Sequence, residues 1–199
     1  DSNETNFFFE KLINDKKTDF SRYNYFYANY LNSKKKKEDA KKIIQEALER
    51  YPRNLLLNQY KKDLTKNKNV LLFDCKNKAH VIAEILYIAA NALSSQSMYL
   101  QSNFYLNLAK YLNEDFHSYN TLLAENFYKI DSYNNARKIY KNLSKKGEAF
   151  HWYSSKQIAR IFIQQENKNE ALKQLKNSYN SLLKKEIYET FDYAEFLKN

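Results

Sequence analysis

Small residues recur along the chain at matching intervals in two series. The first series is Ala28, Ala90, Ala124 and Ala159, and the second is Ala40, Ser102, Ala136 and Ala171. In both series the intervals are 62, 34 and 35 residues. About 34 residues is the length of one pair of antiparallel helices, and small side chains at fixed positions allow two helices to pack closely. The spacing therefore predicts a stack of helical hairpins.

Glycine and proline are almost absent from the chain. The 199 residues include one of each, Gly147 and Pro52. Tight β-hairpin turns depend on residues that adopt positive φ, above all glycine. This composition disfavours folds rich in β-hairpins, and we expect an all-α fold whose connections use Asn, Ser and Asp.

One 34-residue unit carries a family pattern. Ala28, Ala40, Ala47 and Pro52 stand where the tetratricopeptide repeat (TPR) has three small residues and a proline. On these residues the chain resembles the TPR family. The stretch of residues 55–64 followed by residues 70–93 resembles an interrupted unit of long TPR proteins from alphaproteobacteria. The resemblance implies a right-handed α-solenoid of antiparallel helix hairpins. It also implies a non-enzymatic scaffold for protein–protein interaction in a bacterial cell.

The repeat frame divides residues 1–199, expected to be a single solenoid segment of a longer protein. The 62-residue interval is shorter than two repeats, so one unit must be irregular, and residues 66–78 are expected to form an extended connector. The expected parts are the end of an upstream hairpin (1–20), a repeat (21–54), a short irregular unit with the connector (55–82), three repeats (83–116, 117–151 and 152–185) and the start of a further helix (186–199).

The sequence lacks the usual signals of an enzyme. A single glycine excludes a glycine-rich phosphate loop, and His80, His117 and His151 show no metal-ligand spacing. Cys75 is the only cysteine, so it has no partner for a disulfide within the chain. We therefore predict no catalytic, cofactor-binding or metal-binding residues and no cofactor. The longest apolar stretch, residues 81–93, is too short to span a membrane, and the compartment stays open between bacterial cytoplasm and periplasm.

The formal charge of +10 favours acidic partners, although a lysine excess is also typical of an A+T-rich genome. Residues 118–147 also resemble a pentatricopeptide repeat, a helical repeat that reads RNA. Two alternatives to a protein-binding scaffold therefore remain. One is an RNA-binding helical-repeat protein, and the other is the targeting arm of a larger enzyme.

The TPR resemblance implies a concave groove lined by the first helix of each hairpin, at its fifth and ninth positions. Such a groove would hold an extended peptide or a partner's helix. Asn91, Lys156 and Arg160 also resemble part of a carboxylate clamp found in some members, but Glu125 stands where the clamp has asparagine. The groove residues expected in this chain are Tyr25, Asn29, Tyr87, Asn91, Thr121, Glu125, Lys156 and Arg160.

Aromatic residues make up 16% of the chain. Several of them recur at packing positions of the repeat, so most are expected in the core and not on a stacking surface for nucleic acid. Trp152 is likewise expected to pack against a neighbouring hairpin. The recurring positions are Phe104, Tyr105, Phe127, Tyr140 and Phe162.

Overall fold

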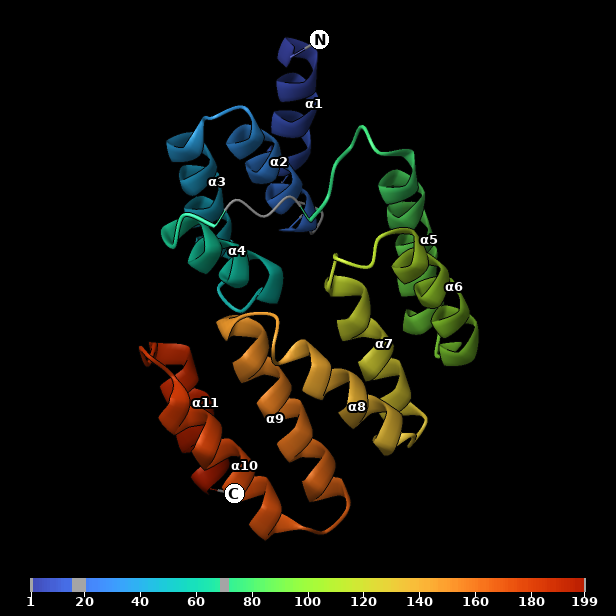
Figure 1. Ribbon diagram of the computed structural model, residues 1–199, viewed down its shortest axis with the longest axis vertical. Coiled ribbons are helices and arrows are strands. Elements are labelled where there is room, and N and C mark those ends of the chain that lie inside the picture. Colours follow the sequence, from blue (N-terminus) through green and yellow to red (C-terminus); the bar gives the residue numbers. More distant parts are fainter. Residues whose placement is uncertain (1, 16–20, 69–71, 199) are drawn as a thin grey trace. The chain divides into compact units, whose positions relative to one another are not determined.

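The computed structural model describes residues 2–15, 21–68 and 72–198. Within these ranges the chain forms eleven α-helices and no β-strands, which confirms the all-α prediction (Figure 1). Part of the expected connector, residues 69–71, and the end of the expected first segment, residues 16–20, lie outside the described residues. The helices are α1 (Ser2–Asn14), α2 (Ser21–Ser33), α3 (Lys37–Arg50), α4 (Leu55–Thr65), α5 (Lys78–Ser95), α6 (Tyr99–Leu112), α7 (Ser118–Lys129), α8 (Tyr133–Leu143), α9 (Glu148–Gln164), α10 (Lys168–Ser181) and α11 (Ile187–Lys198).

Contacts divide the chain into two compact units, Asp1–Phe73 and Asp74–Asn199. Unit 1 contains α1 to α4, and unit 2 contains α5 to α11. The boundary falls within residues 55–82, the range that the sequence marks as irregular.

Packing within each unit is local along the chain. Most contacts between helices join consecutive helices; α2 also contacts α4 in unit 1, and α5 has a small contact with α7 in unit 2. In unit 2 the hairpins α5–α6, α7–α8 and α9–α10 are the most closely packed pairs. Each hairpin thus buries its apolar side against its neighbours in sequence.

The small residues of both series lie at the helix crossings. All eight are at most 1% exposed. In the α5–α6 hairpin the Ser102 hydroxyl donates a hydrogen bond to the Ala90 carbonyl oxygen at 2.8 Å, so one member of each series contacts the other. A larger side chain at either position would separate the two helices.

The same intervals recur in the backbone. Lys35, Ser97, Asp131 and Glu166 have φ values of 63°, 63°, 56° and 58°, and they follow α2, α5, α7 and α9. After each of them the next amide donates to a carbonyl five residues back, for example Met98 to Leu93 at 2.9 Å. This is the Schellman ending of a helix, which most often uses glycine. The end of α4 has the same geometry, with Asn67 at φ 56° and the Lys68 amide donating to the Asp63 carbonyl oxygen at 3.0 Å. Five of the described helices therefore end in the same way, with polar residues in the left-handed conformation.

The outer face of the α5–α6 hairpin differs from the sequence expectation. Tyr140 is fully buried as expected, but Phe104 is 62% exposed. Its position on α6 is opposite to Ser102, which contacts α5, and to the buried Ala109, so the prediction that it lies in the core is wrong. Large apolar side chains line the exposed faces of both helices, namely Val81, Ile82, Ile85, Ile88, Leu100, Phe104, Leu108 and Tyr111.

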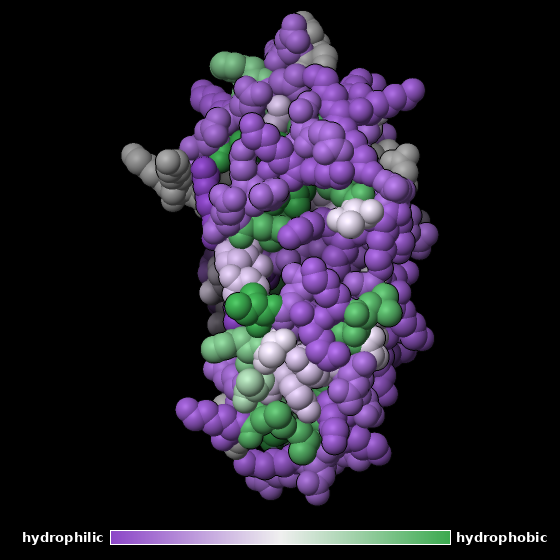
Figure 2. Space-filling view, turned by 90° about the vertical axis from the view of Figure 1, so that its left-hand side faces the viewer, coloured by the Kyte–Doolittle hydropathy of each residue, from purple (hydrophilic) through white to green (hydrophobic). Residues whose placement is uncertain are grey.

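Other apolar side chains are exposed on α11, including Ile187, Phe191 and Leu197. Figure 2 shows one side of the molecule, where hydrophobic patches are separated by hydrophilic side chains. Exposed apolar side chains of this number favour contacts with other macromolecules.

We expect Ala90→Leu to lower the free energy of unfolding by about 1–3 kcal/mol, because three further carbon atoms have no space at the crossing with α6. Ala92→Leu, at an exposed site on the same helix, should change it by less than about 0.5 kcal/mol. Urea unfolding followed by circular dichroism measures both. Equal effects of the two variants would contradict the close crossing.

Glu166→Gly should raise the free energy of unfolding by about 0.5–1 kcal/mol. Glycine avoids the steric cost of the left-handed conformation, and this gain exceeds its larger loss of backbone entropy. The matched change Glu170→Gly, inside α10, should lower the free energy of unfolding by about 1 kcal/mol. Thermal and urea unfolding test the opposite signs, and shifts in the same direction would contradict the assignment of the helix end.

Candidate functional site

The two expected groove residues of unit 1 lie in its interior. Tyr25 is fully buried, and its ring lies edge-on to that of Tyr60 of α4 at 4.9 Å between centroids. Burial, with Tyr60 next in effect, raises the pKa of the Tyr25 hydroxyl above its usual range. Asn29 is 4% exposed. This part of α2 therefore has no open surface for an outside ligand.

Phe73 covers this part of α2. The Asn29 side chain donates a hydrogen bond from Nδ2 to the backbone oxygen of Phe73 at 2.8 Å. The Phe73 ring lies 4.3 Å from that of Phe26, between centroids. Phe73 belongs to a non-helical stretch, so α2 holds a non-helical residue of its own chain by one backbone carbonyl and one aromatic ring.

The equivalent positions of α5 in unit 2 are more open. The Tyr87 ring is half-buried and lies 5.6 Å from that of Tyr119 of α7. Asn91 is exposed, and its side chain has no hydrogen-bond partner among the described residues. Ile88, on the same side of the helix, is 50% exposed. An amide donor and an apolar side chain thus face solvent together.

The structure brings Glu125 and Arg160 into contact. The Arg160 guanidinium lies 3.3 Å from the Glu125 carboxylate and 4.0 Å from the centre of the Tyr128 ring. Tyr140 donates a hydrogen bond to the other Glu125 oxygen at 3.2 Å. Burial, then the nearby Tyr153 and Glu125, raises the pKa of Tyr140, so this hydroxyl stays protonated and donates. Arg160 is therefore already bound to groups of its own chain.

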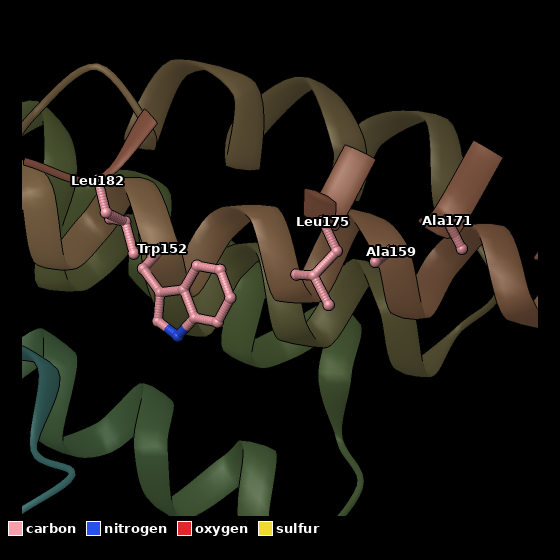
Figure 3. Packing of buried hydrophobic residues seen from close by; sticks show 5 residues of the cluster. All are labelled: Trp152, Ala159, Ala171, Leu175 and Leu182. Carbon is pink, nitrogen blue, oxygen red and sulfur yellow. The ribbon is translucent and has the colours of Figure 1, made fainter. Parts of the chain in front are cut away.

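Lys156 is paired in the same way. Its Nζ lies 2.5 Å from Oδ2 of Asp192 on α11, and the Trp152 indole nitrogen donates to the same oxygen at 3.3 Å. Trp152 is buried, as the sequence predicts, and it packs with Leu182 at one end of the α9–α10 hairpin, whereas Ala159 and Ala171 lie together toward the other end (Figure 3). A ligand carboxylate would have to displace Asp192 or Glu125 to reach either cation.

A buried asparagine that sequence reasoning missed connects three helices of unit 2. The Asn126 amide nitrogen donates to Ser102 Oγ at 2.8 Å and to Asn103 Oδ1 at 2.9 Å, and its oxygen accepts from Ser94 Oγ at 2.6 Å. The sequence could have placed Asn126 on the same face of α7 as Tyr119, because the two residues are seven positions apart. This network fixes α7 against α5 and α6, which orients the surface that carries Asn91.

A polar pocket of about 640 Å³ lies between the C-terminal ends of α6 and α8 and the start of α7. It is lined by basic, acidic and amide side chains, including Lys110, Lys146, Asp115 and His117. Burial, with Lys146 next in effect and Asp115 opposing, lowers the pKa of His117 to about 4. His117 is consequently neutral at pH 7, and its ring lies edge-on to Phe150.

The described residues give no support for a metal site or a membrane-spanning helix. No group of three or more His, Cys, Asp or Glu side chains suited to a metal ion occurs among the described residues. None of the helices in the described ranges has the length and apolar character needed to cross a membrane. Comparison of the sequence with protein-family models and with curated proteins finds no match.

The His117 environment predicts a pH-dependent stability. The unfolded chain binds the proton with a pKa near 6.5, whereas the folded chain binds it only near pH 4. The contribution of His117 is thus complete above pH 6.5 and is lost as the pH falls toward 4. Between pH 7 and pH 5 the free energy of unfolding should fall by about 1–2 kcal/mol more in the native chain than in His117→Gln. Urea unfolding at both pH values measures this, and the same change in both proteins would contradict the burial of His117.

Proposed function

We propose that the protein is a non-enzymatic scaffold of TPR type, a right-handed α-solenoid that binds an extended peptide in the groove formed by the first helices of the hairpins of unit 2. The repeated crossings and the repeated Schellman endings support a stack of similar hairpins. The endings of α2, α5, α7 and α9 have the same intervals of 62, 34 and 35 residues as the crossings, and α4 has a fifth such ending at Asn67.

The observation that carries the proposal is the contact between α2 and Phe73. Asn29 is a groove residue of the TPR frame, and it holds a backbone carbonyl of a non-helical segment. A backbone carbonyl is present in every peptide, so this contact has the chemistry that a peptide-binding groove requires. Asn91 is the equivalent residue of α5, 62 positions later, and its side chain is exposed.

The internal ion pairs narrow the proposed mode of binding. Lys156 and Arg160 are engaged by Asp192 and Glu125, so they give little support to recognition of a terminal carboxylate. Binding through backbone carbonyls and apolar side chains is favoured instead.

Asn91→Ala should reduce capture of the protein's partners from the source cell at least about fivefold, because one hydrogen bond to the bound peptide is lost. Asn177→Ala, at an exposed site of α10, is the matched control and should leave capture unchanged. Both variants should keep the native circular dichroism spectrum and melting temperature, since neither side chain is buried. Quantitative mass spectrometry of the captured proteins gives the readout.

Two outcomes would contradict this proposal. Capture of the same partners at the same level by Asn91→Ala would exclude the groove at α5. Marked preference of the native chain for one RNA sequence at physiological salt would favour the alternative of an RNA-binding helical-repeat protein.

A further inference from the structure

We propose that the surface formed by α5 and α7 binds an extended peptide segment with an aromatic residue, whose backbone carbonyl accepts a hydrogen bond from Asn91 and whose ring covers Ile88. This inference rests on the proposed function and specifies the place and the chemical class of the ligand. Two surfaces of the same chain, one within each unit, support it.

The first helix of each surface, α2 in unit 1 and α5 in unit 2, carries a similar set of residues at the same spacing. Tyr25, Phe26 and Asn29 of α2 correspond to Tyr87, Ile88 and Asn91 of α5, each 62 residues later. Positions three residues apart lie on one face of a helix. In α2 the aromatic residue and the asparagine of this triplet both contact Phe73. In α5 the corresponding residues are Ile88 and Asn91, which are also three positions apart.

A tyrosine of a second helix borders each surface. In unit 1 Tyr60 of α4 lies against Tyr25, and in unit 2 Tyr119 of α7 lies against Tyr87. Leu64 and Leu123 follow these tyrosines by four residues and are both buried. Both α2–α4 and α5–α7 are in contact, α5–α7 less extensively. Each surface is thus bordered by a second helix whose tyrosine ring contacts the first helix, although Tyr60 follows Tyr25 by 35 residues and Tyr119 follows Tyr87 by 32.

The two surfaces differ in their exposure to solvent, because a residue of the same chain covers only the surface in unit 1. In unit 1 Phe26 is 6% and Asn29 is 4% exposed, because Phe73 lies on them and is itself 9% exposed. In unit 2 Ile88 is 50% exposed and Asn91 is exposed. Phe73 thus shows which ligand chemistry this arrangement takes, namely an aromatic ring on the apolar side chain and a carbonyl oxygen on the amide. The unit 2 surface presents both groups to solvent.

The charged residues near this surface do not disfavour binding of an apolar, aromatic peptide segment. α5 carries Lys78 and Glu84 as its only formally charged residues, and Glu84 is buried. On α7 the nearest charged position of the groove is Glu125, which Arg160 neutralises. An uncharged, apolar peptide segment meets no unpaired charge on these positions, so selection depends on the ring and the backbone.

The test uses a fluorescent peptide, VLLFDSK, which copies residues 70–76 with serine in place of Cys75. Fluorescence anisotropy with the complete 199-residue chain should show saturable binding. Replacing the peptide's phenylalanine with alanine should weaken binding at least about tenfold, because the ring supplies most of the buried apolar area. The variants Asn91→Ala and Ile88→Ser should each weaken it about fivefold. Asn177→Ala should not change it.

The outcomes separate this inference from the proposed function. Absence of saturable binding, or binding that tolerates loss of the ring, would overturn the aromatic class, whereas capture of partners that depends on Asn91 would still uphold the scaffold. Binding that Asn91→Ala and Ile88→Ser both leave unchanged would overturn the site, including the case in which the peptide displaces Phe73 from α2. Native circular dichroism of each variant excludes unfolding as the cause, and Ile88 is exposed enough for the substitution to be tolerated.

Discussion

Paired helices of this protein meet where one small residue faces another, as where the Ser102 hydroxyl bonds to the Ala90 carbonyl oxygen. That contact requires the two backbones to lie close together, which in turn fixes the rotation of each helix about its axis. Once Ala90 faces α6, Tyr87 must face α7 and Asn91 must lie beside it toward solvent. The crossing residues thus decide which side chains the outer surfaces can offer, although they contact no ligand themselves.

The helix endings show where sequence reasoning reached its limit. The small residues predicted the hairpins because alanine and serine are visible in the sequence at intervals of 62, 34 and 35 residues. The Schellman endings of α2, α5, α7 and α9 have the same intervals, but Lys35, Ser97, Asp131 and Glu166 share no residue type, and α4 has a further such ending at Asn67. A left-handed residue is recognised from sequence mainly when it is glycine. Here the repeated hairpin packing imposes the conformation on polar residues, so the pattern is geometric and only the structure displays it.

The candidate site shows a second limit. Asn29 and Asn91 are the same residue at the same repeat position, and the sequence treats them alike. Phe73, which lies 44 positions beyond Asn29, buries one and leaves the other exposed. By contrast, the pairs Glu125–Arg160 and Lys156–Asp192 join residues 35 and 36 positions apart. That separation is one repeat, so these pairs were predictable from the frame once facing positions of successive hairpins were compared.

In the proposed groove, carboxylates of the chain itself neutralise Lys156 and Arg160, and this limits the kinds of ligand that these cations can bind. Lys156 and Arg160 each lie against a carboxylate of the next or the preceding repeat position, and a bound anion would have to compete with a partner held at high local concentration. The charge of +10 favours attraction of acidic molecules at long range. In the proposed mode of binding, close recognition depends on the amide of Asn91, which has no hydrogen-bond partner among the described residues, and on the exposed side chain of Ile88. The proposed scaffold thus selects two properties of a partner, its net charge first and then an aromatic residue in an extended segment.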